Sequence, residues 1–294
     1  MAQEVRNIAK LLNPKNDYVF QRIFGYEGNE EITKGLINTI IDDIEIKSIK
    51  LDCKRILERD IENDKLGILD VRAVLGNLMQ CEIEMQVIDK KNIEDRILYY
   101  WSRLYSKSLK RADDYLNAKR TIIILFTDYE LDSLKCIEKY ISRWHIREDE
   151  YANYILTRKL DIAIIEIPKY HKYKGKNKDL DSWIKFIDKP EEIDMDELKE
   201  NKALQKAKEL LEDISEDEYE QDLAFKRDLF LKDKVAIEAA GYDKGIQQGI
   251  QQGIQQGIQQ EKLAIARTML KQNISIADII ACTGLTEKEL DKIK

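Results

Sequence analysis

The sequence predicts an α/β fold, in which helices flank a mixed central sheet and an all-helical region follows. Two continuous apolar runs, RTIIILFTD and LDIAIIEIPKY, have the length and composition of buried strands. Two other strand-like runs are joined by Gly76–Asn77, which is a hairpin signal. Helical stretches lie before and between these strands, and this order favours helices on both sides of a mixed sheet.

The elements are expected in the order helix, sheet, helix, sheet. NDYVFQRIFG spaces Phe20 and Phe24 one helical turn apart, and EEITKGLINTIIDD continues the helical region. The strand-rich stretch then contains IEIKSIKLD, KLGILDVRAVLG and LMQCEIEMQVID. A long amphipathic helix is expected from about residue 93 to residue 115, with Ile97, Trp101 and Leu104 on its apolar side.

The charge and the composition limit the classes of function. The formal net charge is −7, but residues 191–222 carry 14 acidic and 4 basic side chains, so the remainder is mildly basic and DNA binding is permitted. No apolar run approaches the ~20 residues that span a bilayer, so no membrane partner is expected. Four scattered cysteines and the absence of a signal-peptide pattern indicate reduced thiols in a cytoplasmic protein. Because the chain has only two histidines, neither a zinc site nor a histidine-based catalytic triad is expected.

Beyond Pro190 the chain is highly charged and is expected to be helical through about residue 240. Four copies of Gly-Ile-Gln-Gln follow at residues 245–260. A four-residue step advances about 400° around a helix, so the glycines and the isoleucines form two slowly winding stripes. Each glycine lowers helix propensity by about 1 kcal/mol relative to alanine. The repeat is therefore either a helix that self-associates or a repeat-expanded linker.

The last segment, SIADIIACTGLTEKELDKIK, predicts two short helices joined by a turn. Ser275 is suited to cap the first helix, and Thr286 with Glu289 forms a capping box for the second. A helix that reads DNA usually carries more cationic or amide side chains than EKELDKIK does. This composition favours a structural hairpin over a DNA-reading helix-turn-helix.

The strand LMQCEIEMQV has polar side chains at alternate positions. Glu82, Glu84 and Gln86 share one face, because successive side chains in a strand point to opposite faces. Burying a carboxylate without a partner costs several kcal/mol. Either this face meets water, as in a half-exposed antiparallel strand, or its carboxylates serve a charged ligand.

Asp70 ends an apolar run on the preceding strand and is the candidate partner for that face. With a strict two-residue turn at Gly76–Asn77, Asp70 falls opposite Ile83 and shares the apolar face. A turn one residue longer, or a bulge, sets Asp70 opposite Glu82 or Glu84. Two carboxylates that converge in this way supply the hard oxygen ligands that Mg²⁺-assisted phosphodiester hydrolysis needs.

Several motifs together resemble a known family. NPKNDYVFQRIFG, LDVRAVLGNLMQCEIEMQ, RILYYWSRLYS and IAIIEIPKY are similar to segments of the Rpn family, the recombination-promoting nucleases also described as transposases. This family belongs to the PD-(D/E)XK nuclease superfamily. The resemblance covers about residues 8–190, and the Gly-rich repeat with the segment after it resembles the C-terminal region of the same family. It implies a restriction-endonuclease-like core and a Mg²⁺- or Mn²⁺-dependent DNA endonuclease linked to DNA recombination or transposition.

The resemblance also implies site residues. The metal ligands correspond to Asp70 and Glu84, and the catalytic set is completed by Gln86, where much of the superfamily has lysine. Glutamine supplies no positive charge, so it orients water or phosphate without neutralising charge. Glutamine is nevertheless the residue that this family usually shows. The alternative function is a catalytically inactive nuclease-fold module that binds DNA or protein and oligomerises through residues 245–260.

Further acidic residues have two interpretations each. Glu82 is either a secondary metal ligand or, as we favour, a solvated or lysine-paired side chain. Asp17 either caps its helix, which we favour, or approaches the metal. Glu166 lies within an apolar strand, so a lysine or arginine partner is expected.

A basic ridge is expected on the long helix beside the carboxylates. Arg96, Arg103, Lys107 and Lys110 are spaced 7, 4 and 3 residues apart, which places them on one helix face. Such a ridge holds a DNA backbone. For Lys107 and Lys110 a solvated face is an equal alternative. The sequence thus divides into a nuclease-like domain (1–190), an acidic helical segment (191–240), the repeat (241–260) and a C-terminal helical hairpin (261–294).

Overall fold

The computed structural model describes residues 10–52, 71–89, 91–173, 175 and 177–292. The chain forms two compact units, residues 1–230 and residues 231–294. None of the helices in the described ranges combines the length and the hydropathy that crossing a membrane requires.

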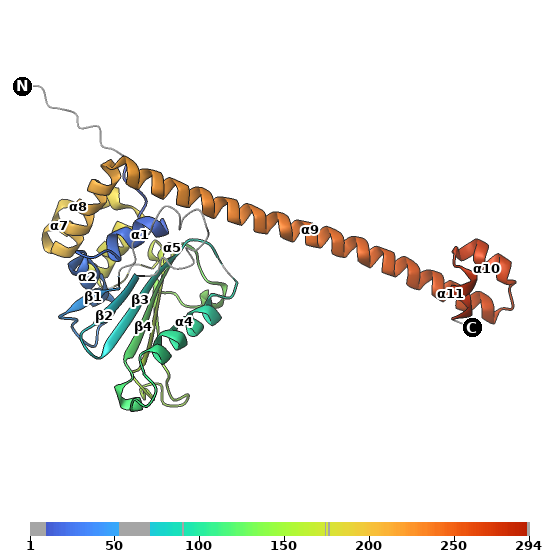
Figure 1. Cartoon of the computed structure of the whole chain (residues 1–294), viewed down its shortest axis with the longest axis horizontal. Coiled ribbons are helices and arrows are strands. Elements are labelled where there is room, and N and C mark those ends of the chain that lie inside the picture. Colours follow the sequence, from blue (N-terminus) through green and yellow to red (C-terminus); the bar gives the residue numbers. More distant parts are fainter. Residues whose placement is uncertain (1–9, 53–70, 90, 174, 176, 293–294) are drawn as a thin grey trace, which may run out of the picture. The chain divides into compact units, whose positions relative to one another are not determined.

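A six-stranded mixed sheet forms the centre of the first unit and confirms the α/β class (Figure 1). The strand order is β1-β2-β3-β4-β6-β5, with β3, β4 and β6 parallel to one another and the other pairings antiparallel. The strands are β1 (Ile49–Leu51), β2 (Val71–Leu75), β3 (Met79–Gln86), β4 (Arg120–Thr127), β5 (Ile141–Trp144) and β6 (Leu160–Glu166).

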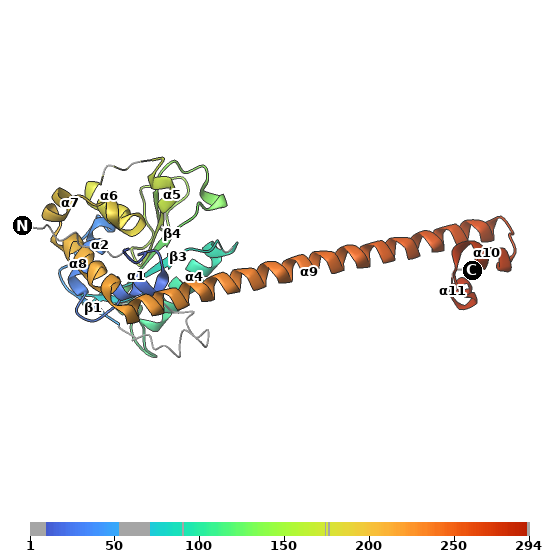
Figure 2. The same cartoon turned by 90° about the horizontal axis from the view of Figure 1, so that it is seen from above.

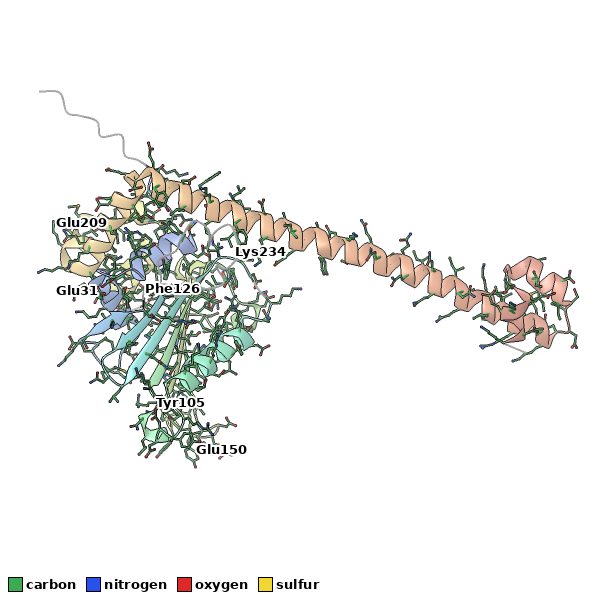
Figure 3. All side chains as sticks on the ribbon, viewed as in Figure 1. Glu31, Tyr105, Phe126, Glu150, Glu209 and Lys234 are labelled. Carbon is green, nitrogen blue, oxygen red and sulfur yellow. The ribbon has the colours of Figure 1, made fainter. Side chains whose placement is uncertain are left out.

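Helices cover both faces of the sheet, as the element order predicts (Figures 1 and 2). The larger core lies against α1 (Asp17–Phe24), α2 (Glu30–Ile40), α6 (Lys178–Asp188) and α8 (Lys202–Glu216). There Phe126 of β4, labelled in Figure 3, meets Phe20 with 5.9 Å between ring centroids. The smaller core lies under α4 (Ile93–Lys107), whose Ile93 and Ile97 pack with Ile123 and Leu125 of β4. Among the described residues, this unit also contains α5 (Ile167–Tyr170), α7 (Met195–Glu200) and short 3-10 turns at Tyr115–Asn117, Asp132–Leu134 and Pro190–Glu192.

The turn between β2 and β3 is one residue longer than a two-residue hairpin turn. Leu75 pairs with Met79, so three residues form the turn, and Gly76 has a φ of 60°, which glycine adopts without strain. At the other end of the ladder, Val71 pairs with Ile83. Of the registers that the sequence allows, the structure therefore has the longer-turn one.

Helix α4 ends at Lys107, earlier than the expected residue 115. After it the backbone turns, because Ala112 adopts a φ of 80° and the Asp113 carboxylate accepts the N–H of Lys110 at 2.8 Å. Lys110 therefore lies outside the helix and does not share a helix face with Arg96, Arg103 and Lys107.

The core of the first unit continues beyond residue 190. Leu204, Ala207 and Leu211 of α8 are fully buried in the larger core. Gly35 of α2 makes this close packing possible, because a Cβ atom there would lie 2.4 Å from the Cβ of Ala203. The acidic segment thus carries an apolar stripe that packs onto the sheet domain.

The second unit contains the greater part of α9 and two short helices. Helix α9 extends over Glu218–Lys271 and includes the whole Gly-Ile-Gln-Gln repeat. Its last turns pack with α10 (Ile276–Thr283) and α11 (Glu287–Asp291) around Ala266, Ile279, Leu285 and Leu290. The Ser275 cap and the Thr286–Glu289 capping box confirm the predicted hairpin, and Gly284 turns the chain with a φ of 66°.

Candidate active site

The polar face of β3 is buried. Glu82, Glu84 and Gln86 are 2%, 7% and 8% exposed, because β3 lies between β2 and β4 and its polar face points toward α4. This burial excludes the interpretation of a half-exposed strand whose polar face meets water. Each of these groups therefore needs a partner within the protein or in a ligand.

Arg96 of α4 joins Glu84 to Gln86. Its Nη2 forms a short ion pair with the Glu84 carboxylate, and its Nη1 donates to Gln86 Oε1 at 3.1 Å. The amide of Gln86 is oriented by a second hydrogen bond, from Nε2 to the carbonyl of Ile88 at 3.1 Å. Arg96 Nε donates to the Tyr100 hydroxyl at 3.2 Å, and the guanidinium lies 5.2 Å from the centre of that ring. Four side chains thus form one network at the C-terminal end of β3.

Glu82 has a separate partner on the neighbouring strand. Arg72 of β2 lies opposite Glu82 in the ladder and donates from Nε to its carboxylate at 2.9 Å. Arg72 and Glu82 line a small cavity of about 20 Å³, and Arg103 and Lys107 of α4 line it as well. Two of the predicted ridge residues are therefore placed beside the polar face of β3, over Arg72 and Glu82.

Asp17 is the first residue of α1 and is held by a bidentate ion pair. Asn16, not Asp17, caps the helix, since its side chain accepts the N–H groups of Tyr18 and Val19. The carboxylate of Asp17 accepts from Arg227 Nε at 2.9 Å and from Nη2 at 2.6 Å. Asp17 therefore links α1 to the N-terminal part of α9 through this ion pair.

The structure describes only part of the predicted metal site. Asp70 lies outside the described residues, and within the described ranges no group of three or more metal-binding side chains is found. The donors that are present, the Glu84 carboxylate and the Gln86 amide oxygen, are hard oxygen ligands. Such donors fit Mg²⁺ or Mn²⁺, which take one or two carboxylates and keep several waters.

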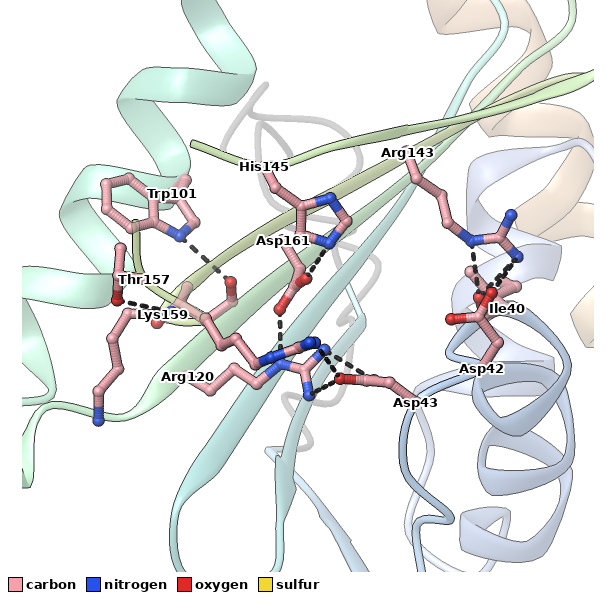
Figure 4. Close-up of polar contacts among 12 residues, drawn as sticks. Ile40, Asp42, Asp43, Trp101, Arg120, Arg143, His145, Thr157, Lys159 and Asp161 are labelled. Carbon is pink, nitrogen blue, oxygen red and sulfur yellow. Dashed lines mark hydrogen bonds and ion pairs between the residues drawn. The ribbon is translucent and has the colours of Figure 1, made fainter. Parts of the chain in front are cut away.

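A second charged cluster lies at the opposite end of the strands (Figure 4). The Asp161 carboxylate accepts from Arg120 at 2.5 Å and lies 2.7 Å from His145 Nε2, while Arg120 also binds Asp43 through two contacts of 2.9 Å. This cluster borders a cavity of about 290 Å³. Sequence reasoning does not find it, because its members come from the end of α2, the starts of β4 and β6, and the end of β5.

Another cluster fastens the segment before α1 to the edge of the domain. Lys15 Nζ lies 2.9 Å from both Asp128 and Asp188, and His171 lies 2.8 Å from Asp188. Burial raises the pKa of Asp188, but the hydrogen bonds from Lys15 and His171 outweigh it and keep that pKa below its ordinary value of 3.8. Burial lowers the pKa of Lys15, but its bonds to Asp188 and Asp128 leave it above 10.5.

Comparison with known proteins adds two findings. Residues 14–240 match the family described as PD-(D/E)XK nuclease family transposase. Residues 259–294 match the C-terminal HTH domain of the Rpn/YhgA-like nuclease family. No curated protein and no solved structure matches the chain. The second match favours DNA binding by the C-terminal unit, whereas its residues alone favour a structural hairpin.

Proposed function

Because the chain belongs to the PD-(D/E)XK nuclease family transposases, we propose that it is a Mg²⁺- or Mn²⁺-dependent DNA endonuclease acting in recombination or transposition. It hydrolyses phosphodiester bonds, and its catalytic residues are Asp70, Glu84 and Gln86. The free thiols of Cys81, Cys136 and Cys282 fit the cytoplasm, where the DNA substrate of such an enzyme is found.

The observation that carries this proposal is the network at the end of β3. Glu84 is a buried carboxylate beside an oriented amide, as the polar side of a phosphodiesterase site requires. The turn between β2 and β3 is the longer one, for which Asp70 is expected opposite Glu82 or Glu84. In this proposal Asp70 and Glu84 hold the metal, and Gln86 orients water or phosphate through its amide.

The metal, when bound, would supply an activated water and would offset the charge that develops on the phosphate. The chain itself holds the DNA. Arg103 and Lys107 on α4, with Lys110 just beyond it, face the backbone phosphates, and the C-terminal helix-turn-helix adds a second DNA contact. Glu82 and Asp17 remain outside the metal shell, because Arg72 and Arg227 engage their carboxylates.

Cleavage of supercoiled plasmid in the presence of Mg²⁺ tests the activity. Asp70→Ala and Glu84→Ala should each lower the cleavage rate by about 10²- to 10³-fold or more, as loss of a charge-stabilising group does. Asp95→Ala removes an exposed carboxylate from α4 and should leave the rate unchanged. Equal rates for the wild type and the two site variants would refute the proposal.

Calorimetry with Mn²⁺ tests the metal ligands directly. Glu84→Ala should abolish binding, whereas Glu82→Ala should retain it, since Glu82 is paired with Arg72. Equal losses in the two variants would make Glu82 a metal ligand as well.

The repeat in α9 supports a second part of the proposal, association of two copies of the chain. Ile246, Ile250, Ile254 and Ile258 are 44–59% exposed, and a Cβ atom on any of the four repeat glycines would meet no atom within 4 Å. The isoleucines form a ridge at four-residue spacing and the glycines form a groove beside it. Ridges of this spacing pack into the matching grooves of a second helix, so the surface is complementary to itself.

Sedimentation of the full chain tests this association. Replacing the four isoleucines with glutamine should convert the dimer to a monomer, and Gln248→Ala with Gln252→Ala should not. A monomeric wild type would exclude association and leave the repeat as a linker. A gel shift without cleavage by a dimeric wild type would favour the alternative, an inactive DNA-binding module.

A further inference from the structure

The charge balance at the end of β3 raises a question about the proposed nuclease. Gln86 is neutral, so the strand supplies a carboxylate and an amide but no cation for a phosphate under attack. Electrostatic stabilisation of developing charge is usually the largest contribution to such a reaction. The cation must therefore come from another element.

Arg96 is placed where that cation is needed. Its guanidinium touches the Glu84 carboxylate through Nη2 and the Gln86 amide oxygen through Nη1, 3.1 Å away. It reaches these groups from α4, which packs against β4 and is anchored by the buried Ile93 and Ile97. The base of the side chain is thus fixed on a rigid element.

The exposure of the pair indicates a binding role in addition to a structural one. The Arg96 side chain is 20% exposed and that of Glu84 is 9% exposed, so Arg96 is the more accessible partner of the pair. A phosphate from the solvent can therefore reach the guanidinium. Guanidinium groups bind phosphate oxygens through two parallel N–H donors, which a lysine cannot do.

We propose that Arg96 is a catalytic residue of this site, which supplies from α4 the positive charge that Gln86 lacks and binds the phosphate under attack. This inference rests on the proposed nuclease function and goes beyond a backbone contact for Arg96. Before DNA binds, the same guanidinium neutralises Glu84. In the complex it donates to the non-bridging phosphate oxygens, so Glu84 and the phosphate share one cation.

Two matched variants on α4 separate chemistry from DNA binding. Arg96→Gln should lower the single-turnover cleavage rate at saturating DNA by about 10²- to 10³-fold, with less than about a threefold change in DNA affinity measured with Ca²⁺. Arg96→Lys should recover part of the rate, because it keeps the charge and loses the second donor. Arg103→Gln should instead weaken DNA binding and reduce its salt dependence by about one phosphate contact. The control Asp95→Ala, an exposed residue of α4, should change neither the DNA affinity nor the cleavage rate.

Mn²⁺ calorimetry provides a readout that does not depend on cleavage. If Arg96 acts on the phosphate, Arg96→Gln should bind Mn²⁺ as tightly as the wild type or more tightly, because a competing cation has been removed from Glu84. A tenfold or greater loss of Mn²⁺ affinity that Arg96→Lys does not restore would overturn the proposal, since Arg96 would then only hold Glu84 in place. An unchanged cleavage rate in Arg96→Gln would also overturn it.

The controls distinguish this inference from the proposed function. If the wild type cleaves, Glu84→Ala does not and Arg96→Gln does, then only the inference about Arg96 fails. If the wild type and Glu84→Ala are equally inactive, the nuclease proposal fails and the role of Arg96 fails with it. Thermal unfolding of Arg96→Gln and Arg96→Lys identifies any variant that has lost its fold, and Arg96→Lys then decides the question.

Discussion

Two buried carboxylates stand at the ends of β3 and β6 and have different surroundings. Glu166 of β6 and its partner Lys169 are each 1% exposed, with 2.8 Å between their charged atoms. The other carboxylate oxygen of Glu166 accepts the N–H of Leu131 at 2.8 Å, and Lys169 also donates to the carbonyls of Leu134 and Ile137. This pair thus holds the loop after β4 against α5. Lys169 also confirms the lysine or arginine partner that is expected for Glu166.

Glu84 of β3 is paired as well, but its cation lies at the surface. Arg96 is 20% exposed and divides its donors among Glu84, Gln86 and Tyr100. The difference shows how one type of contact serves two purposes. A pair enclosed by backbone groups fixes a loop, whereas a pair with a partly exposed arginine remains accessible to an anionic ligand.

The largest expected effect on stability is at the enclosed pair. Lys169→Met should lower the free energy of unfolding by about 3–5 kcal/mol, because it leaves Glu166 charged and buried without a cation. Urea denaturation of the whole chain measures this loss. A loss under about 1 kcal/mol would show that the Glu166–Lys169 pair contributes little to the stability of the fold.

The second variant sharpens this result by removing both charges. Glu166→Gln combined with Lys169→Met should be more stable than the sum of the two single losses predicts, by about 1–3 kcal/mol, since neither charge is left unpaired. The same denaturation experiment on the four proteins gives the coupling. Additive losses would contradict a direct interaction of this size.

The third variant breaks the accessible pair. Glu84→Gln should lower the free energy of unfolding by only about 1–2 kcal/mol, because its amide oxygen still accepts from Arg96 and the partly exposed guanidinium is hydrated. Cleavage should nevertheless be lost, since the amide lacks the negative charge with which the Glu84 carboxylate holds a divalent cation. A stability loss equal to that of Lys169→Met would erase the distinction between the two pairs.

The smallest expected effect concerns Asp188, whose partners Lys15 and His171 are 17% and 51% exposed. Because its folded pKa lies below 3.8, Asp188 stabilises the fold above pH 3.8, and that contribution is lost as the pH falls through the folded pKa. Lys15, with a pKa above 10.5, contributes below that pH and loses its contribution at higher pH. Asp188→Asn should therefore cost about 1 kcal/mol or less between these limits.

Stability measured from pH 2 to pH 7 tests the Asp188 prediction. The difference between wild type and Asp188→Asn should shrink as the pH falls below 3.8. A difference that grows on acidification would contradict the depressed pKa.

Patterns local in sequence predict much of this fold. Alternation in LMQCEIEMQV places Glu84 and Gln86 on one face, and the apolar runs predict β4 and β6. The capping residues Ser275, Thr286 and Glu289 predict both C-terminal helices. These features depend on neighbours within a few residues, so a single sequence contains them.

What the sequence does not reveal depends on partners distant along the chain. Asp17 and Arg227 are 210 residues apart, so nothing near Asp17 indicates that it is held by α9. The spacing of Arg96 from the other basic residues of α4 predicts a ridge that binds the DNA backbone. Only the packing of α4 on the sheet brings Arg96 to Glu84 and Gln86. The turn at Gly76 is a different case: it is local, but the sequence allows two registers, and the pairing of Leu75 with Met79 selects the longer turn.

The contact between Gly35 and Ala203 has a practical consequence for shortening the protein. A chain cut at residue 190, where the composition changes, would strip α8 from α2 and leave the apolar side of α2 bare in water. Such a fragment should precipitate, whereas a fragment ending after Phe230 keeps this side covered. The apolar side chains of the acidic stretch thus complete the core of the sheet domain.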